Sequence, residues 1–208
     1  ALMAQFTIGG TEPGTTAIDY QKLFNRLSLQ LGDSPPALLE LSTAARLENY
    51  QKQTKEKGGI PVDRDFEELL YQYGRYLMIS CSRPGEGAMP ANLQGLWSIS
   101  KSPPWRCDYH TDVNIEMNYW FTDPSNISEC FTPLAEWIDS IREVRKEETQ
   151  KVLNIKRGWL TRSENGIFGG STWHFQKGDS AWLCRNLWDH YAFTRDKEYL
   201  KRYAYPVM

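Results

Sequence analysis

Three polar residues at alternate positions, His110, Asp112 and Asn114, form the most distinctive group of chemically useful side chains in the sequence. An imidazole, a carboxylate and an amide together could bind a polar ligand, and the carboxylate could accept a proton from it. Side chains at positions i, i+2 and i+4 point to one side only where the backbone is extended, and on a helix they diverge. If the three act together, we expect an extended stretch here, followed by a helix that begins near Asn114.

The residues between these three sharpen the expectation. In an extended stretch the packed side would be occupied by Tyr109, Thr111 and Val113. A plainer interpretation is also open, in which Thr111 or Asp112 caps a helix and His110 is an ordinary loop histidine. A helix that runs continuously through residues 109–115 would exclude the three-residue site.

Aromatic residues are frequent, with 8 Trp, 11 Tyr and 8 Phe making up 13% of the chain. Aromatic faces stack against the apolar C–H faces of sugars, but the same side chains also fill the core of helical domains. Trp97, Trp105 and Trp173 are candidate sugar platforms, and the core is the plainer interpretation for each. Among the polar residues of the same stretches, Glu164 could bind a ligand or be a surface charge.

Helices must position these residues. Apolar residues at helical spacing, together with capping residues and breakers, predict helices at 19–31, 42–50, 64–82, around 117–120 with an end at 123, 128–153, 180–194 and 197–208. Two Gly-rich stretches, 83–108 and 158–179, predict long irregular loops, and no run of strands is expected. In the first loop, Asn92 and Gln94 could bind a ligand or brace the loop, and we expect bracing.

Two helices have clear apolar stripes. In the helix at 64–82, which Asp63 should cap, the inward residues are expected to be Phe66, Leu69, Leu70, Tyr73, Leu77 and Cys81. In the helix at 128–153 they are expected to be Leu134, Trp137, Ile138, Ile141 and Val144. Its charged end at 142–151 is interpreted as a solvated face. Together the elements favour an all-α domain of helical hairpins with long loops that carry the site.

Composition excludes several classes of function. The chain has 208 residues, 40% of them hydrophobic, and a formal net charge of −2, which gives no electrostatic footprint for nucleic acid. No stretch reaches the length of a membrane span, and no signal peptide is visible. The four cysteines, Cys81, Cys107, Cys130 and Cys184, show no metal-binding spacing and could be disulfides or buried thiols. We expect no metal and no other cofactor.

Several long motifs, in order along the chain, resemble the catalytic domain of glycoside hydrolase family 95, the inverting α-L-fucosidase family. They lie at 75–85, 90–97, 104–120, 158–159 and 181–194, and the third contains the letters DYHTDVNIEMNYW. The resemblance implies a partial (α/α)6 toroid at residues 18–208, the first half of the catalytic domain. Residues 1–17 would then be a linker or the end of a preceding domain.

The resemblance also implies roles for the first three residues. The family holds its attacking water with a His-x-Asn-x-Asn motif, which here reads His110-Thr-Asp112-Val-Asn114. His110 would contact the sugar, while Asp112 and Asn114 would hold the water. Asp112 replaces the first asparagine of the motif, so it could hold the water through its carboxylate or take the proton directly.

The general acid of the family is a Glu further downstream, and no Glu of this chain matches its position. We therefore expect the chain to need the remainder of the same polypeptide, to act on a fucosylated glycan, and to be inactive alone. The enzyme would be exported to the periplasm or cell surface of a bacterium. Three alternatives stay open: a non-catalytic carbohydrate-binding or structural fragment, an α-L-galactosidase of the same family, and a toroid lyase that uses Tyr109 and His110.

Overall fold

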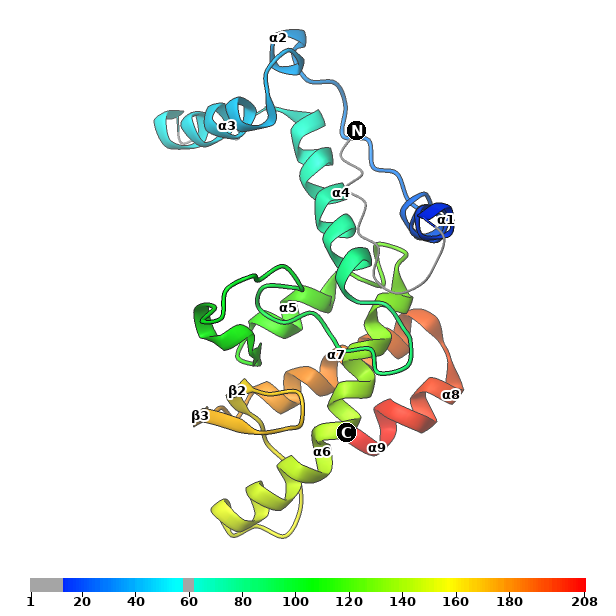
Figure 1. The fold of residues 1–208 in the computed structure, drawn as a ribbon, viewed down its shortest axis with the longest axis vertical. Helices are drawn as coiled ribbons and strands as arrows, with labels where there is room; N and C mark the ends of the chain where they lie inside the picture. Colours follow the sequence, from blue (N-terminus) through cyan, green and yellow to red (C-terminus); the bar gives the residue numbers. More distant parts are fainter. Residues whose placement is uncertain (1–12, 58–61) are drawn as a thin grey trace.

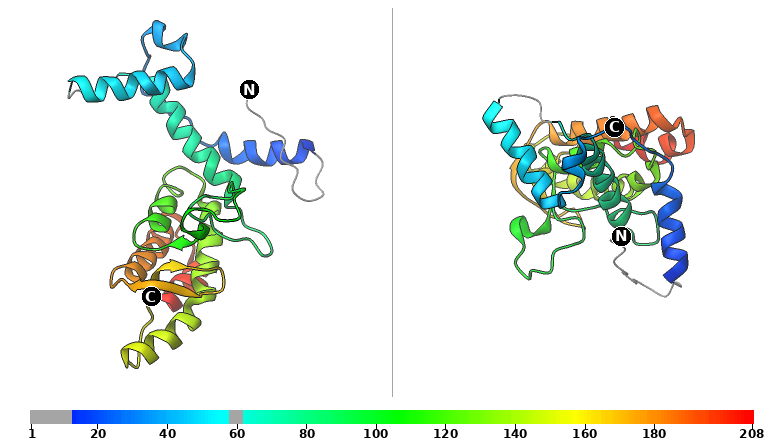
Figure 2. Two further views of the ribbon diagram at one scale, coloured as in Figure 1. Left: turned by 60° about the vertical axis from the view of Figure 1, so that its left-hand side comes forward. Right: turned by 90° about the horizontal axis from the view of Figure 1, so that it is seen from above.

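The computed structural model describes residues 13–57 and 62–208. Figures 1 and 2 show two parts: an N-terminal arm, in which α3 and the first turns of α4 project outward, and a body that contains α5–α9 and the strands. The arm is made of α1 (Pro13–Phe24), α2 (Pro36–Leu39), α3 (Thr43–Lys57) and α4 (Arg64–Cys81). Helix α4 runs from the arm into the body and joins the two parts.

Helix α4 begins where the sequence predicts. The Asp63 carboxylate accepts a hydrogen bond from the Phe66 amide at 3.2 Å, which is the expected N-cap. The same carboxylate accepts from Ser34 Oγ at 2.8 Å and pairs with Arg46, so the cap also ties α3 and the loop before it to α4. The hydrogen bonds from Arg46 and Ser34 hold the pKa of Asp63 below its usual value.

The predicted apolar stripe of α4 is only partly buried. Phe66 and Cys81 lie in the interior, whereas Leu69, Leu70 and Tyr73 are 44–54% exposed. The prediction that the whole stripe faces inward is therefore wrong for its middle part. The reason is geometric: α4 projects from the body in Figure 1, so few elements pack on the middle of the helix.

Helix α1 is displaced from its predicted position. It begins at Pro13, inside the stretch predicted as a linker, and ends at Phe24 rather than near Leu31, which is 45% exposed. Its end is fixed by Arg75 of α4, whose guanidinium donates to the carbonyl oxygens of Leu23 at 3.0 Å and Phe24 at 2.8 Å. A cation that binds the last carbonyls of a helix can end it without a glycine.

Helix α3 follows the prediction at its start. Ser42 Oγ accepts a hydrogen bond from the Ala45 amide at 3.3 Å, as expected for an N-cap. The helix then continues past Tyr50 to Lys57. The short α2 was not predicted, because the prolines at 35 and 36 read as a helix stop although proline also suits the first position of a helix.

The body is built around the helix α6 (Thr132–Leu153), which follows a 3₁₀ turn at Ser128–Phe131. The body also contains α5 (Asn114–Trp120), α7 (Asp179–Thr194), α8 (Lys197–Tyr199), a π-helical turn at Leu200–Ala204 and α9 (Tyr205–Val207). Helix α6 contacts the π-helical turn and α9, while α5 packs on α7. The predicted inward residues Leu134, Trp137, Ile138 and Ile141 are all buried, with Leu183 and Leu187 of α7 in the same core.

The second half of α6 differs from the prediction in two ways. Val144, expected to point inward, is 47% exposed. Arg145 and Thr149 are buried, so the charged end at 142–151 is not simply a solvated face. Arg145 binds Glu148, and the Leu160 amide donates to Thr149 Oγ1 at 2.9 Å, because the chain after α6 folds back on this end.

A small antiparallel sheet corrects the expectation of no strands. Its order is β1 (Tyr109–His110), β2 (Arg162–Asn165) and β3 (Ser171–Phe175), so the second predicted loop contains a hairpin. Gly169 in the hairpin turn has a φ of +78°, and a Cβ atom there would lie 3.2 Å from Ile141 Cβ. The turn therefore needs glycine both for its backbone and for its approach to α6.

The four cysteines are all free thiols. Burial raises the pKa of Cys81 to about 11 and that of Cys130 to about 12. They pack as small apolar side chains in the core. Of the two possibilities that the sequence left open, the structure has the thiol.

Candidate active site

The three residues His110, Asp112 and Asn114 lie where β1 meets α5. His110 ends the strand, Thr111–Val113 form a turn, and α5 begins at Asn114, as predicted. The extended stretch is therefore shorter than expected, and no helix runs through residues 109–115. The N-terminus of α5 has no side-chain cap, so the alternative in which Thr111 or Asp112 caps the helix is wrong.

His110 stands between two carboxyl groups. Its Nδ1 lies 2.9 Å from Asp108 Oδ2, and its Nε2 lies 3.5 Å from Asp112 Oδ2. The Asp108 side chain is 9% exposed, whereas that of Asp112 is 41% exposed. Asp108 thus fixes the imidazole from the protein side, and Asp112 lies at the surface where a ligand could reach it.

The turn between β1 and α5 is held by a buried network. The Thr111 amide donates to the Ser163 carbonyl at 3.0 Å, and Thr111 Oγ1 donates to the Arg162 carbonyl at 2.9 Å. Asn165 Nδ2 donates to the Tyr109 carbonyl at 3.1 Å. These bonds explain why Tyr109 and Thr111 face the interior as predicted. Val113, expected to do the same, is 43% exposed because it follows the turn rather than a continued strand.

Two buried carboxyl groups that the sequence analysis did not single out lie behind the turn. Asp179, the first residue of α7, accepts a hydrogen bond from Thr111 Oγ1 at 3.2 Å. Burial, with a contribution from the charge of Asp112, raises the pKa of Asp179 to about 6. Glu116 on α5 is completely buried, and burial raises its pKa to about 8, with the Asp179 and Asp112 charges acting in the same direction.

One signal in the sequence pointed to Glu116. It continues the alternate spacing of His110, Asp112 and Asn114 by one more step. Asp108 precedes His110 by two residues, the same spacing that selected the other three, and it too was missed. Burial raises the pKa of Asp108, while its hydrogen bond with His110 acts against that rise.

The three candidate tryptophans are exposed, with 43% of Trp97, 58% of Trp105 and 60% of Trp173 accessible to solvent. The core interpretation is therefore wrong for all of them. The Trp105 ring meets the His110 ring edge to face, with centroids 5.5 Å apart. Contacts in the described structure tie only Trp105 of the three directly to His110.

The backbone around Trp105 is strained. Trp105, Arg106 and Cys107 have φ values of 52°, 56° and 53°, in the left-handed region that non-glycine residues avoid. Such strain persists only where surrounding contacts hold it, and it is concentrated at functional sites. Arg106 supplies one of those contacts through an ion pair with Glu164.

Glu164 is buried rather than a surface charge, with 6% of the residue exposed. Thr172 Oγ1 donates to Glu164 Oε2 at 2.8 Å, and the Arg106 guanidinium pairs with the same oxygen. A pocket of about 340 Å³ opens beside Glu164. Its lining includes Asn92, Arg106, Asp108, Tyr109, Glu164, Asn165 and Thr172.

This pocket has an unpaired acceptor in its wall. Asp108 Oδ1 is buried and has no hydrogen-bond partner in the described structure. A buried acceptor without a donor is costly, so Asp108 Oδ1 is an energetically unfavourable point of the pocket wall. The Arg106 guanidinium at the same wall adds donors, so the pocket suits a ligand that carries several hydroxyl groups.

Asn92 and Gln94 brace the first long loop, as predicted. The Gln94 amide donates to Asn92 Oδ1 at 2.8 Å, and Gln94 Nε2 donates to the Pro104 carbonyl at 3.3 Å. Asn92 also lines the pocket, so bracing does not exclude contact with a ligand. Tyr109 cannot serve as the base of a lyase, because it packs on Trp137 in the core and burial raises its pKa to about 12.

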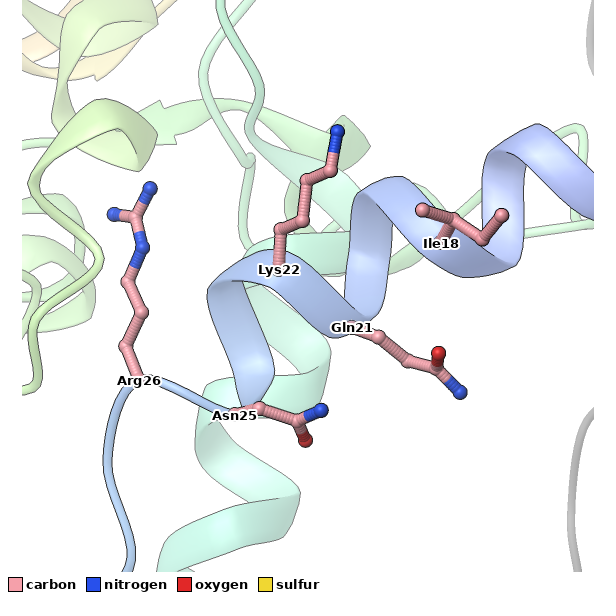
Figure 3. Close-up of a pocket in the computed structure, with 5 residues that line it drawn as sticks. All are labelled: Ile18, Gln21, Lys22, Asn25 and Arg26. Carbon is pink, nitrogen blue, oxygen red and sulfur yellow. The ribbon is translucent and has the colours of Figure 1, made fainter.

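A second pocket, of about 310 Å³, lies on α1 and on the turn that follows this helix (Figure 3). Its lining comprises Ile18, Gln21, Lys22, Asn25 and Arg26, whose side chains point in several directions from the helix. It offers no carboxylate and no aromatic platform. The pocket beside Glu164, which has a carboxylate in its lining, is therefore the better candidate for sugar chemistry.

Among residues 13–57 and 62–208, no group of three His, Cys, Asp or Glu residues is placed to hold a metal ion. Over the same residues, none of the helices combines the length and apolar character that a bilayer crossing requires.

Comparison with known proteins gives one consistent result. The sequence model of the glycosyl hydrolase family 95 catalytic domain matches residues 15–208. Alpha-L-fucosidase 2 of Arabidopsis thaliana is 38% identical over 200 residues, which cover 91% of this chain and 22% of that protein. Probable alpha-fucosidase A of Aspergillus niger is 35% identical over 197 residues, which cover 91% of this chain and 24% of that protein.

The chain thus spans less than a quarter of the length of these curated relatives. The match agrees with the mainly helical structure and with the fold class expected from the sequence, a partial α/α toroid with irregular loops at the site. By its match over nearly all of its length, this chain belongs to glycosyl hydrolase family 95.

Proposed function

We propose that this chain is part of a glycoside hydrolase that removes terminal α-L-fucose from glycans by attack of water, with inversion at the anomeric carbon. The arrangement of His110 carries the proposal: it is fixed by Asp108 from behind, and it meets Asp112 and the exposed Trp105 in front. The names of the Arabidopsis and Aspergillus relatives support fucose as the sugar. Export of the enzyme remains part of the proposal and rests on the family resemblance.

Asp112 and Asn114 are the proposed holders of the attacking water. The water oxygen forms a bond to the anomeric carbon while the bond from that carbon to the leaving oxygen breaks. The water gives one proton either to Asp112 or to a further carboxylate of the longer polypeptide, and the leaving oxygen takes a proton from a general acid. Inverting enzymes keep these two carboxyl groups roughly 6.5–9.5 Å apart to admit the water.

The general acid is proposed to come from the remainder of the polypeptide, because none of the carboxyl groups here matches the position of the family's acid. Sugar recognition is assigned to the pocket beside Glu164. In its lining, Asp108 and the Arg106–Glu164 pair offer acceptors and donors for hydroxyl groups. Trp105 is not part of that lining and offers an apolar face beside His110.

The direct test compares this chain with the longer polypeptide that contains it, using a nitrophenyl α-L-fucoside. Hydrolysis by the longer form alone is expected. Proton NMR of the first product should show β-L-fucose, since inversion of an α-fucoside gives the β anomer. An α anomer as first product would overturn the inverting mechanism. Faster hydrolysis of a nitrophenyl α-L-galactoside would replace L-fucose by L-galactose as the proposed substrate. Binding of fucosyllactose without hydrolysis in either form would favour a carbohydrate-binding module.

The role of Asp112 can be tested within the longer polypeptide. Asp112→Ala is expected to lower kcat by about 10²–10⁴-fold, the usual contribution of an acid or base. Asp112→Asn restores the family's asparagine and should retain more activity than alanine if holding the water is its main task. Asp33→Asn, at an exposed position of the arm, is the matched control. Equal kcat values for Asp112→Ala and this control would remove Asp112 from the mechanism.

A further inference from the structure

Glu116 is the most completely buried carboxyl group of the described chain that the proposed reaction does not use. Its residue is 0% exposed, and neither Oε1 nor Oε2 has a hydrogen-bond partner. A carboxylate buried without any donor is strongly disfavoured, whereas a neutral carboxylic acid tolerates the same surroundings far better.

The position of Glu116 links it to the candidate site. It lies in the first turn of α5, two residues after Asn114, and this helix has only seven residues and no side-chain N-cap. The main anchor of this turn to α7 is a hydrogen bond from Asn186 Nδ2 to the Glu116 carbonyl oxygen at 3.1 Å. Asn186 Oδ1 is itself buried without a partner, so the surroundings of Glu116 are rich in acceptors and poor in donors.

The charged groups around Glu116 also disfavour its ionised form. From the turn before α5 comes Asp112, and from the start of α7 comes Asp179; both act to raise its pKa. On β1, His110 pairs with Asp108 and Asp112.

The basic side chains further along α7 are engaged elsewhere. Arg185 binds Asp189 on the exposed side of the helix. His190 pairs with Asp123 at 2.9 Å. Neither is shown to pair with Glu116.

From this geometry we infer that Glu116 is a positioning residue: it holds a proton at neutral pH, and its neutral form keeps the first turn of α5, and with it Asn114, in place. The inference rests on the proposed function for its link to catalysis. Loss of the proton would leave a buried carboxylate whose only nearby donor in the described structure is its own backbone amide. The side chain would then have to turn out or admit water, and the turn that carries Asn114 would move with it.

Two spectroscopic measurements test the inference without relying on activity. The infrared C=O band of a protonated carboxyl group should be present at pH 7 and disappear as pH rises through about 8. It should be absent in Glu116→Gln and retained in Glu147→Gln, an exposed glutamate on α6. The side-chain amide resonance of Asn114 should shift with the same midpoint in the wild type and should not titrate in that range in Glu116→Gln.

A band that survives in Glu116→Gln, or an Asn114 resonance that shifts equally in both proteins, overturns the inference. In the longer polypeptide, the basic limb of kcat against pH should move upward in Glu116→Gln, because the amide keeps the neutral shape at every pH. An unmoved limb, together with a titrating Asn114 resonance, would deny the catalytic consequence. If the longer polypeptide hydrolyses no fucoside, the proposed function fails, while the infrared and NMR results still decide the state of Glu116.

Discussion

Arg75 in the arm and Glu116 in the body are both completely buried ionisable residues, but they differ in their hydrogen-bond partners. Four oxygen atoms surround the Arg75 guanidinium: the carbonyls of Leu23, Phe24 and Leu27, and Gln72 Oε1, at 2.8–3.2 Å. Glu116 has no partner at either oxygen. A buried charge with several oxygen partners fixes structure, although Arg75 Nε itself is unpaired, whereas a buried acid without partners is kept neutral and responds to pH.

Burial also affects the charge of the two side chains differently. Burial lowers the pKa of Arg75, yet an arginine starts so high that it stays charged. Burial raises the pKa of Glu116 to about 8, which lies inside the range where proteins are used and measured. The charge in the arm is therefore permanent, and the charge beside the candidate site is conditional.

The largest expected effect is at Arg75. Arg75→Met keeps much of the side-chain volume but leaves the carbonyl oxygens at the end of α1 without their donor. The partners of Arg75 are neutral oxygens, and each buried acceptor left without a donor costs about 1–3 kcal/mol of the free energy of unfolding. Denaturant unfolding measures it, and Arg64→Met, at the half-buried first residue of the same helix, where the arginine pairs only with Glu67 among the described residues, is the control. A loss below that of the control variant would contradict the structural role.

A smaller effect that depends on pH is expected at Glu116. Below its ordinary pKa near 4.5 both folded and unfolded states are protonated, so the group costs nothing. As pH rises from there to about 8, only the unfolded state ionises, and the free energy of unfolding falls by a few kcal/mol. Asp179 adds a smaller loss of the same sign between its ordinary value near 3.8 and about 6.

Thermal unfolding at several pH values measures this loss. Glu116→Gln cannot ionise, so its stability should fall less between pH 5 and pH 8, the approximate limits set by the two pKa values. Glu147→Gln should follow the wild type. Parallel pH curves for Glu116→Gln and the wild type would show that Glu116 ionises with its ordinary pKa in the folded state.

Local signals in the sequence predicted much of the fold. The Asp63 cap, the Ser42 cap and the start of α5 at Asn114 depend on neighbouring residues, and all three were found. The hairpin β2–β3 was missed because strand pairing is not local and the letters RSEN of β2 are polar. The end of α1 was missed because it depends on Arg75, about 50 residues away in the sequence.

The site was predictable only as a set of residue types. Spacing and family resemblance selected His110, Asp112 and Asn114, and the structure leaves their roles as a prediction. Burial of Glu116 could not be predicted, because it results from the packing of α7 on α5. A glutamate in a short helix reads as a surface residue unless the neighbouring element is known.

Tyr119 is an intermediate case between Arg75 and Glu116, and Tyr119→Phe is expected to cost about 1–3 kcal/mol. The hydroxyl accepts from the Ala91 amide at 2.7 Å and lies 2.7 Å from Ser82 Oγ. Ser82 keeps its bond to the Cys130 carbonyl in the variant, so only the Ala91 amide loses its partner. Urea unfolding measures the loss. Tyr205→Phe, at a position 76% exposed, should be neutral, and an equal result for both would deny the hydroxyl a role in holding the first long loop.

The smallest expected effect is at Arg26, which pairs with Glu129 at 2.8 Å across the boundary between the arm and the body. Its distance is as short as those at Arg75, but the two side chains are 36% and 42% exposed. Water already solvates both charges, so Arg26→Ala should change the free energy of unfolding by about 0.5 kcal/mol or less, and high salt should remove the difference. Unfolding of both proteins at low and at high salt measures it. A loss as large as that of Arg75→Met would mean that contact distance, rather than burial and the number of partners, decides what an arginine contributes to this fold.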